Sequence, residues 1–343
     1  MQAGTSSSSK QPQVTPERLM QFAFGYAPPI MISTAVELGI FDALDSGAKS
    51  VADLAKSLSA SERGLRMLLN GLTGFELLAK DGDRYSLTPE SATFLVSSKP
   101  AYYGALYRRL CSHQLHGWLS LADAVRTGHP VQDVVDTAGA GEFFKELVPS
   151  LFPINYAPAQ ALARALVFPA GQTPRILDLA AGSGVWGIAA AQQHPQARVT
   201  GVDLDPVIPI TRSMAARFGL ESRFDFITGD VLKADLGSGY SVAIIGHLLH
   251  GLGVKDSQHL IRRTAAALVP GGTIAIAEYL VNQERSGPPF SLVFALNMLL
   301  HSAEGDTFSF EEISGWLNEA GFEKARLLEA PGPSPLVLAT KRS

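Results

Sequence analysis

One short stretch in the middle of the chain limits the possible folds most strongly. Residues 175–187 read RILDLAAGSGVWG, so an apolar run leads into Gly182-Ser183-Gly184, and an Ala-rich segment follows at 188–193. This is the pattern of a strand, a tight loop and a helix. Glycine lets the backbone approach a ligand closely, and the first turn of a helix offers unpaired N–H groups. The stretch therefore predicts a ligand-binding loop in an α/β domain.

The glycine spacing alone does not identify the ligand. Gly182, Gly184 and Gly187 satisfy the GxGxxG pattern, which would also suit NAD. In a dinucleotide site the strand stays apolar up to the first glycine, because the pyrophosphate needs N–H donors and no neighbouring carboxylate. Asp178 breaks that pattern and favours a ligand with a cationic end, such as S-adenosyl-L-methionine (SAM). NAD stays open as the alternative.

Composition narrows the class of protein. The chain has 343 residues, of which 46% are hydrophobic and 17% charged, which is enough for a large core and two domains. A net charge of −4 and a pI near 6.1 argue against nucleic acid as the main partner. The single cysteine, Cys111, allows neither an intrachain disulfide nor a Cys-rich metal site, and we expect no bound metal.

The termini and apolar runs bear on localisation. Residues 1–15 are rich in Ser and Gln and are predicted to be a disordered leader, not a secretion signal. The longest apolar runs, near residues 290–300, are about half of what a bilayer crossing needs. We therefore expect a soluble, cytoplasmic protein without a membrane partner.

The first part of the chain is mainly helical. Apolar residues recur every three or four positions from residue 16 to 95, and residues 79–87 suggest two short strands around an Asp-Gly turn. Three helices with such a hairpin predict a winged-helix domain at residues 16–100. Residues 101–170 are predicted to be a helical linker that contributes to the substrate pocket, and 171–343 form the ligand-binding domain.

The second part alternates strands and helices. Strands are expected at 198–203, 224–228, 242–246 and 273–278, with helical segments between them, which predicts right-handed βαβ units and a parallel sheet. Two further strands, 322–329 and 336–341, are joined by only six residues and should pair antiparallel. The predicted fold is therefore α/β: a Rossmann-like, doubly wound seven-stranded sheet that ends in an antiparallel hairpin, preceded by the winged helix.

A series of landmarks carries a family resemblance. In chain order they are DLAAGSG at 178–184, GVDLDP at 201–206, GD at 229–230, LH at 249–250 and LVPGGT at 268–273. In this order, the chain resembles the class I SAM-dependent small-molecule O-methyltransferases with an N-terminal winged-helix dimerisation domain, over about residues 16–342. The resemblance implies a homodimeric enzyme of secondary metabolism that binds SAM and methylates a hydroxyl of an aromatic or polyketide-like small molecule.

The resemblance also implies a cofactor site. It places SAM against Asp178, Gly182, Gly184, Asp203, Leu204, Gly229, Asp230 and Val231. The Asp203 carboxylate can accept both ribose hydroxyls, whereas Asp205 is expected to cap the helix that begins near Pro206. Asp230 would lie beside the adenine amino group. Its alternative role is that of an ordinary turn residue.

His250 is the candidate general base. A phenol has a pKa near 10 and is a poor nucleophile at pH 7 until an imidazole, with a pKa near 6.5, takes its proton. Many relatives follow this histidine with Asp-Trp, whereas here Gly251-Leu252 follows. Asp306 is the expected carboxylate partner, with Glu304 as a competitor. The alternative is a loop or core histidine, of which His247 is an example nearby.

The acceptor site is expected between the helices that precede the sheet and the insertion after the fifth strand. Its candidate residues are Phe144, Phe152, Asn155, Tyr156, Phe294, Met298 and His301. An aromatic wall with few polar groups suits a flat hydrophobic acceptor. The same residues would also suit a core or a dimer interface, and His301 could be a second proton acceptor or a structural histidine.

Three other functions stay open. A SAM enzyme of this fold could methylate carbon or nitrogen, or catalyse a reaction without net methyl transfer. An NAD-dependent oxidoreductase would also use the glycine loop. The third is a DNA-binding regulator that reads DNA with the helix at 61–77. The two basic residues there, Arg63 and Arg66, are balanced by the acidic Glu62 and Glu76, so the helix lacks the positive charge that DNA binding needs. We therefore expect its apolar face to be a dimer surface.

Overall fold

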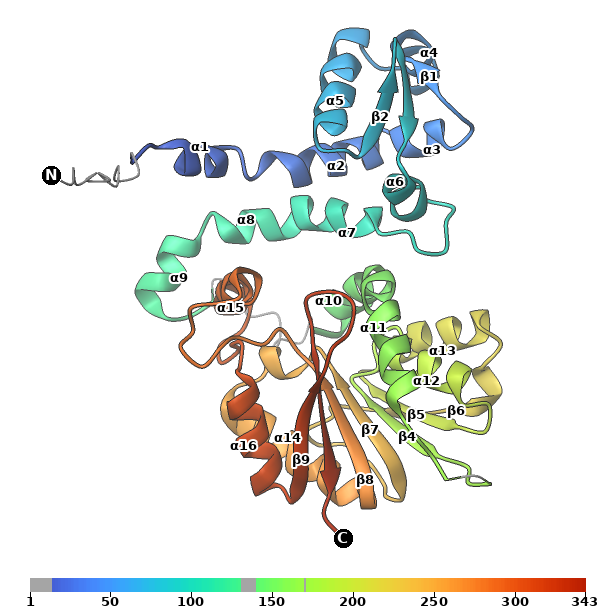
Figure 1. Cartoon of the computed structure of the whole chain (residues 1–343), viewed down its shortest axis with the longest axis vertical. Coiled ribbons are helices and arrows are strands. Elements are labelled where there is room, and N and C mark those ends of the chain that lie inside the picture. Colours follow the sequence, from blue (N-terminus) through green and yellow to red (C-terminus); the bar gives the residue numbers. More distant parts are fainter. Residues whose placement is uncertain (1–13, 131–139, 170) are drawn as a thin grey trace, which may run out of the picture. The chain divides into compact units, whose positions relative to one another are not determined.

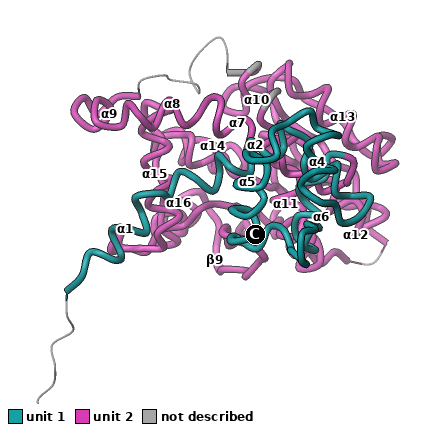
Figure 2. The backbone as a smooth tube through the Cα atoms, turned by 90° about the horizontal axis from the view of Figure 1, so that it is seen from above, with its two compact units in different colours: residues 1–97 teal, residues 98–343 magenta. Residues whose placement is uncertain are grey.

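The structure is a computed structural model that describes residues 14–130, 140–169 and 171–343. The predicted leader therefore lies outside the described residues up to residue 13. The chain divides into two compact units, residues 1–97 and 98–343 (Figure 2). Each unit is described by itself.

The first unit is a small helical domain with a three-stranded sheet. Its helices are α1 (Glu17–Ala23), α2 (Ala27–Glu37), α3 (Ile40–Leu44), α4 (Val51–Leu58), α5 (Glu62–Gly74) and α6 (Pro89–Phe94). Its antiparallel strands run in the order β1 (Lys49–Ser50), β3 (Arg84–Leu87), β2 (Leu78–Asp81). The predicted hairpin around the Asp-Gly turn is confirmed, with Gly82 in the left-handed region at φ 59°. Ser50 caps α4, because its side chain accepts the Asp53 backbone N–H.

An apolar surface runs along the start of this unit. Leu19, Met20, Phe22 and Phe24 are all more than 60% exposed. The helical stretch Glu17–Glu37 is long and apolar enough to cross a membrane by length and composition alone, and 17% of it is buried. The sequence-based search for long apolar runs missed this stretch, because polar residues interrupt it. In unit 1 itself, this face is left uncovered.

The second unit contains the large sheet (Figure 1). Its strands are β4 (Arg175–Leu179), β5 (Arg198–Asp203), β6 (Phe224–Thr228), β7 (Tyr240–Gly246), β8 (Leu268–Ala277), β9 (Phe322–Leu328) and β10 (Leu336–Lys341). Their order is β6-β5-β4-β7-β8-β10-β9. Strands β4 to β8 pair in parallel, and β10 pairs antiparallel with both β8 and β9. The predicted seven-stranded sheet with its antiparallel hairpin is confirmed.

Unit 2 has helices before the sheet and between its strands. Those before it are α7 (Gly104–Arg109), α8 (Leu115–Trp118), α9 (Leu121–Thr127), α10 (Ala140–Leu147) and α11 (Phe152–Ala165). Those within it are α12 (Val185–Gln193), α13 (Ile208–Arg217), α14 (Val254–Ala267), α15 (Pro289–His301) and α16 (Phe310–Glu319). Alternate residues of the strands join two separate apolar clusters, one with α14 and α16 and the other with α11 and α12. The sheet is therefore covered on both sides, as doubly wound sheets require.

The strand order fixes where a ligand can bind. From β4 the chain proceeds outward to β5 and β6, then returns to β7 on the other side of β4. Ligands of open α/β sheets bind at such a reversal, beyond the carboxyl ends of the strands. Asp203 ends β5, Gly229 follows β6 by one residue, and Glu278 follows β8 directly. The topology thus brings these residues to one edge of the sheet.

Candidate active site

The loop after β4 is shaped by left-handed glycines. Gly182 and Gly184 have φ values of 55° and 72°, and Gly184 is the N-cap of α12. A Cβ on Gly184 would lie 3.0 Å from Thr211 Cγ2, so a side chain there would be both strained and crowded. Thr211 Oγ1 donates to the Gly182 carbonyl at 2.6 Å. The loop is therefore held so that bare backbone and the start of α12 form one surface.

Asp203 closes this loop from the neighbouring strand. Its Oδ2 accepts the Gly182 N–H and its Oδ1 accepts the Leu204 N–H, both at 2.7 Å. Burial raises the pKa of Asp203 to about 6, against the opposing effect of these two hydrogen bonds. The group is therefore ionised at pH 7. Asp205 is exposed, and α13 begins after Val207 without a side-chain cap, so the predicted capping role of Asp205 is wrong.

Asp178 lies below the loop and faces protein, not open space. Its side chain is fully buried, and Oδ2 accepts the Gly187 N–H at 2.9 Å. Burial raises the pKa of Asp178 to about 8, so the carboxyl is mostly protonated at pH 7. The bond to Gly187 assigns Asp178 to holding the start of α12. Its predicted contact with the cationic end of the ligand stays a prediction.

The third strand end is a turn. Gly229 has a φ of 150° and donates its N–H to the Asp203 carbonyl at 2.8 Å. Asp230 Oδ1 accepts the Leu232 N–H at 2.9 Å, and its Oδ2 lies 3.2 Å from Lys233 Nζ. Val231 is buried in the core of the unit. These contacts suit the turn-forming alternative for Asp230, whose carboxylate still keeps part of its surface exposed.

His250 lies just beyond β7, in the short helix η4 (Leu249–Gly251), and is bonded to a buried carboxylate. His250 Nδ1 is 2.7 Å from Glu278 Oε2, and the His250 backbone N–H donates to Oε1 at 3.3 Å. Burial alone would raise the pKa of Glu278, but the charge and hydrogen bonds of His250 hold it below its ordinary value. Glu278 is therefore an anion. In the neutral form of His250, Nδ1–H donates to this carboxylate and Nε2 is left as a proton acceptor.

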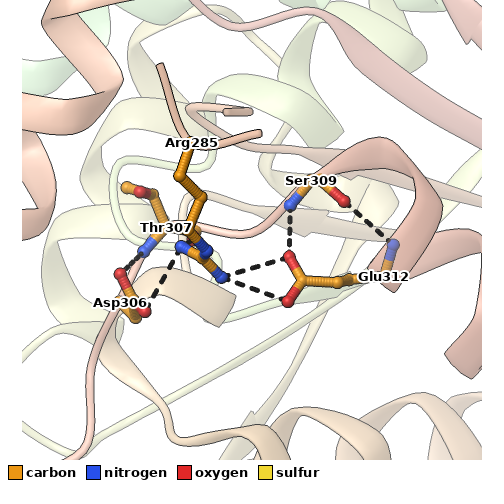
Figure 3. Close-up of polar contacts among 5 residues, drawn as sticks. All are labelled: Arg285, Asp306, Thr307, Ser309 and Glu312. Carbon is orange, nitrogen blue, oxygen red and sulfur yellow. Dashed lines mark hydrogen bonds and ion pairs between the residues drawn. The ribbon is translucent and has the colours of Figure 1, made fainter. Parts of the chain in front are cut away.

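Asp306 has other partners (Figure 3). Its Oδ1 accepts the Thr307 N–H at 2.7 Å, and its Oδ2 lies 3.5 Å from Arg285 Nη1. Arg285 also reaches Glu312, whose carboxylate caps α16 through the Ser309 N–H. The prediction that Asp306 orients His250 is wrong, because Arg285 and the Thr307 backbone hold Asp306.

Glu278 takes the role expected of Asp306, and sequence reasoning missed it. Glu304, the expected competitor of Asp306, is exposed and packs on Gly253, where a Cβ would lie 2.8 Å from Glu304 Cβ. The available signal was a single acidic residue that ends the apolar run Thr273–Ala277. A carboxyl group at the end of a buried strand needs a partner. The short helix after the neighbouring strand β7 supplies His250.

Aromatic rings surround His250. We call the set His247, Tyr279, Phe290 and Phe294 the aromatic shell. The Phe294 ring lies 4.9 Å from the His250 ring and 4.4 Å from the Tyr279 ring, and Phe290 lies 5.0 Å from Tyr279. Burial raises the pKa of Tyr279 to about 12, so it stays a neutral phenol. The predicted residue Phe294 is thus next to the candidate base, whereas sequence reasoning did not single out Tyr279 or Phe290.

Other predicted acceptor residues lie elsewhere. Phe152 and Tyr156 stack on Phe218 at 5.4 and 6.1 Å between ring centres, and the Tyr156 hydroxyl bonds Gln192. The contacts of Phe152 and Tyr156 are thus those of core packing, which was the alternative to an acceptor-binding role. Phe144 packs edge-on against Phe143.

The remaining predicted residues lie on α11 and α15. Asn155 is half-buried on α11. Met298 is buried one turn after Phe294, on the same side of α15. His301 Nδ1 lies 2.8 Å from the Asn297 carbonyl, which suits a structural histidine.

Comparison with known proteins decides the family. The O-methyltransferase domain matches residues 160–323, which include the ends of the five strands from β4 to β8. The O-methyltransferase dimerisation domain matches residues 20–97. The chain belongs to the SAM-dependent O-methyltransferase family. This family assignment argues against the two alternatives of an NAD-dependent oxidoreductase and a DNA-binding regulator.

The relatives of this O-methyltransferase are similar over almost their whole length. One is the 3-hydroxy-5-methyl-1-naphthoate 3-O-methyltransferase of Streptomyces sahachiroi, 29% identical, with 99% of this chain and 100% of the relative covered. Another is the tetracenomycin polyketide synthesis 8-O-methyl transferase of Streptomyces glaucescens, 28% identical, with 95% and 97% covered. Human N-acetylserotonin methyltransferase in complex with SAM superposes with a TM-score of 0.82 at 25% identity, covering 98% of this chain and all of that one.

Proposed function

We propose that this enzyme transfers a methyl group from SAM to a hydroxyl of an aromatic or polyketide-like small molecule, with His250 as the general base. The observation that carries the proposal is the 2.7 Å contact between His250 Nδ1 and the buried Glu278 carboxylate. It leaves Nε2 free to take a proton beside the aromatic shell. The naphthoate and polyketide methyltransferases among the relatives support this class of acceptor.

The residues present fit the cofactor. The left-handed Gly182 and Gly184 shape the loop that leads into α12, and Asp203 is an anion at the end of β5 that can accept ribose hydroxyls. Gly229, Leu204 and the Asp230 carboxylate are proposed to border the adenosine. When bound, SAM supplies a methyl group activated by its sulfonium and leaves as S-adenosylhomocysteine.

The chain itself removes the acceptor proton. A phenolic hydroxyl with a pKa near 10 is only slightly ionised at pH 7, so a neutral imidazole must accept the proton during the reaction. The Glu278 carboxylate then faces the imidazolium and stabilises its charge. The Phe294 and Tyr279 rings offer flat apolar surfaces that hold the acceptor ring and keep water away from Nε2.

We also propose that the enzyme is a homodimer formed through unit 1. The exposed apolar residues Met20 and Phe22 of α1 and Phe24 directly after it lie in the segment that the dimerisation domain matches, and a second copy would cover them. We retain residues 16–100 as this domain, 101–170 as the linker to the pocket and 171–343 as the SAM-binding domain. A monomeric mass in sedimentation equilibrium would contradict the dimer.

The test is methyl transfer from labelled SAM to a panel of phenolic acceptors. His250→Ala should lower turnover by about 100-fold or more, the usual contribution of a general base. S-adenosylhomocysteine should bind this variant as it binds the parent. The matched control is His259→Ala, which removes an exposed histidine from α14 and should leave turnover unchanged. Equal activity of His250→Ala and the control would remove His250 from the mechanism. Analogues without a free hydroxyl test methylation of carbon or nitrogen.

A further inference from the structure

His247 is placed at the active site by a strained backbone. It is the first residue after β7, its φ is 55°, and its N–H donates to the Ala277 carbonyl at 2.9 Å. Positive φ is uncommon for residues other than glycine, and such strain is found most often at functional sites. Pairing between β7 and β8 therefore holds the side chain at the edge where Glu278 and His250 also lie.

The His247 ring has two unused nitrogens. The residue keeps some exposed surface, yet both Nδ1 and Nε2 are shielded from solvent and have no hydrogen-bond partner within the described part of the chain. A buried polar group without a partner is costly and unusual in a folded protein. Burial also lowers the pKa of His247 to about 4, so the ring is neutral at pH 7, with one donor and one acceptor. It can serve a ligand that is polar but need not be charged.

The neighbours of His247 are the residues of the proposed reaction. Its ring centre lies 6.2 Å from that of His250, 4.7 Å from that of Tyr279 and 6.2 Å from that of Trp186. Trp186 is the second residue of α12 and packs against Gly246, where a Cβ would clash with the indole. An acceptor held against Tyr279, with its hydroxyl at His250, would thus present its adjacent atoms to His247.

A metal ion is the alternative ligand for these groups, since one ligand atom each from His247, His250 and Glu278 lie within 4.8 Å of one another. Both Glu278 oxygens are already bonded to His250, so a metal ion would break the contacts that hold this histidine. A hydrogen bond from His247 to an oxygen of the acceptor leaves those contacts in place.

We propose that His247 binds a second oxygen of the acceptor, next to the hydroxyl that His250 deprotonates. The preferred acceptors are therefore aromatic rings with two oxygen functions on neighbouring positions. A neutral imidazole can accept from a hydroxyl or donate to a carbonyl, so an ortho-diphenol and a hydroxyl beside a carbonyl both qualify. This inference rests on the proposed function and names its substrate class.

The test compares two isomers, 2,3-dihydroxynaphthalene and 2,6-dihydroxynaphthalene, which differ only in the spacing of their hydroxyls. The parent should prefer the 2,3 isomer in kcat/KM, and His247→Phe should remove about five- to tenfold of that preference, the value of one neutral hydrogen bond, mostly through KM. The pH profile of kcat should not move, because His250 and Glu278 are intact. His259→Phe makes the same substitution at an exposed site and should change nothing.

A second variant guards against misfolding. His247→Asn keeps a donor and an acceptor and tolerates positive φ, so it should retain part of the preference for the 2,3 isomer. The inference is overturned if the parent shows no preference, if both isomers lose equally in His247→Phe and His247→Asn, or if EDTA abolishes the preference and Zn²⁺ restores it.

Failure of the proposed function would look different. The parent would then bind S-adenosylhomocysteine but methylate neither isomer. Calorimetric titration of the isomers into the S-adenosylhomocysteine-loaded parent and His247→Phe would still decide the role of His247. The inference is supported if His247→Phe binds the 2,3 isomer more weakly than the parent does and binds the 2,6 isomer equally well. It is overturned if both proteins bind the 2,3 isomer equally well.

Discussion

The substitution Glu278→Gln tests how the active site activates its base. Gln has the shape of Glu, but its single amide oxygen can accept only one of the two donors that Glu278 binds, the Nδ1–H or the backbone N–H of His250. We expect it to accept the closer Nδ1–H, so that the amide NH2 lies beside the longer, 3.3 Å backbone contact. It also lacks the negative charge that faces the imidazolium once His250 has taken the proton. The variant therefore removes the charge from the 2.7 Å contact between His250 Nδ1 and residue 278 and gives up one long backbone hydrogen bond.

The size of the effect follows from the burial of this pair. The Glu278 side chain is 3% exposed and the His250 side chain 15%, so little solvent screens them. A hydrogen bond to a charged group contributes about 1.5 to 3 kcal/mol, and one between neutral groups about 0.5 to 1.5 kcal/mol. The loss in the transition state is then about 1 to 2 kcal/mol. Since about 1.4 kcal/mol is tenfold in rate, kcat should fall about 5- to 30-fold.

The assay measures the rate of methyl transfer in a single turnover, with S-adenosylhomocysteine as the detected product. The affinity for S-adenosylhomocysteine, measured separately, should stay unchanged. Asp306→Asn is the matched control, because it also removes one carboxylate charge from this region, but that charge pairs with Arg285 at an exposed site. Its rate should stay within about twofold of the parent, as surface ion pairs contribute little. A normal rate in Glu278→Gln together with a slow Asp306→Asn would refute the assignment of Glu278.

Two further predictions concern pH. Because the pKa of Asp203 is raised to about 6 and the ribose hydroxyls need its carboxylate, affinity for S-adenosylhomocysteine in calorimetry should fall as pH drops from 7 to 5, and Asp203→Asn should bind weakly at every pH. The pKa of Asp178 is raised to about 8 from an ordinary value near 3.8, so its contribution to stability is complete below about pH 4 and is lost as pH rises through 8. Asp178→Asn cannot ionise, and its Tm should therefore rise relative to the parent between pH 5 and 8; a constant difference would contradict this.

Local sequence patterns were sufficient for the sheet. The glycine loop, Asp203 and Gly229 each mark the end of a strand. Each of these ends can be predicted locally, because an apolar run and a turn residue lie within a few positions of each other. The predicted start of β8 was less accurate: Leu268 pairs with Tyr240 before a register shift, so the strand begins at Leu268 and not at the expected residue 273. A bulge depends on the neighbouring strand, which a single run of sequence does not describe.

The partner of His250 could not be read from the sequence for the same reason. Glu278 lies 28 residues away, and the register that pairs Gly246 with Ala277 brings Glu278, directly after β8, to the short helix after β7 that contains His250. Asp306 was chosen by its place in a family pattern. Its charge is instead neutralised by Arg285, a residue that no local pattern connects to it.

The acidic residues at the sheet edge work because their environments differ. Asp178, with no charged partner and a single backbone bond, is mostly neutral at pH 7, whereas Asp203, with two backbone bonds, and Glu278, with a histidine, are anions. Three carboxylates of equal charge would repel one another and any approaching hydroxyl oxygen. Separation of their pKa values leaves one anion for the cofactor and one for the base. Between about pH 6 and 8 the site therefore holds both charges that methyl transfer needs, without a third buried charge beneath the glycine loop.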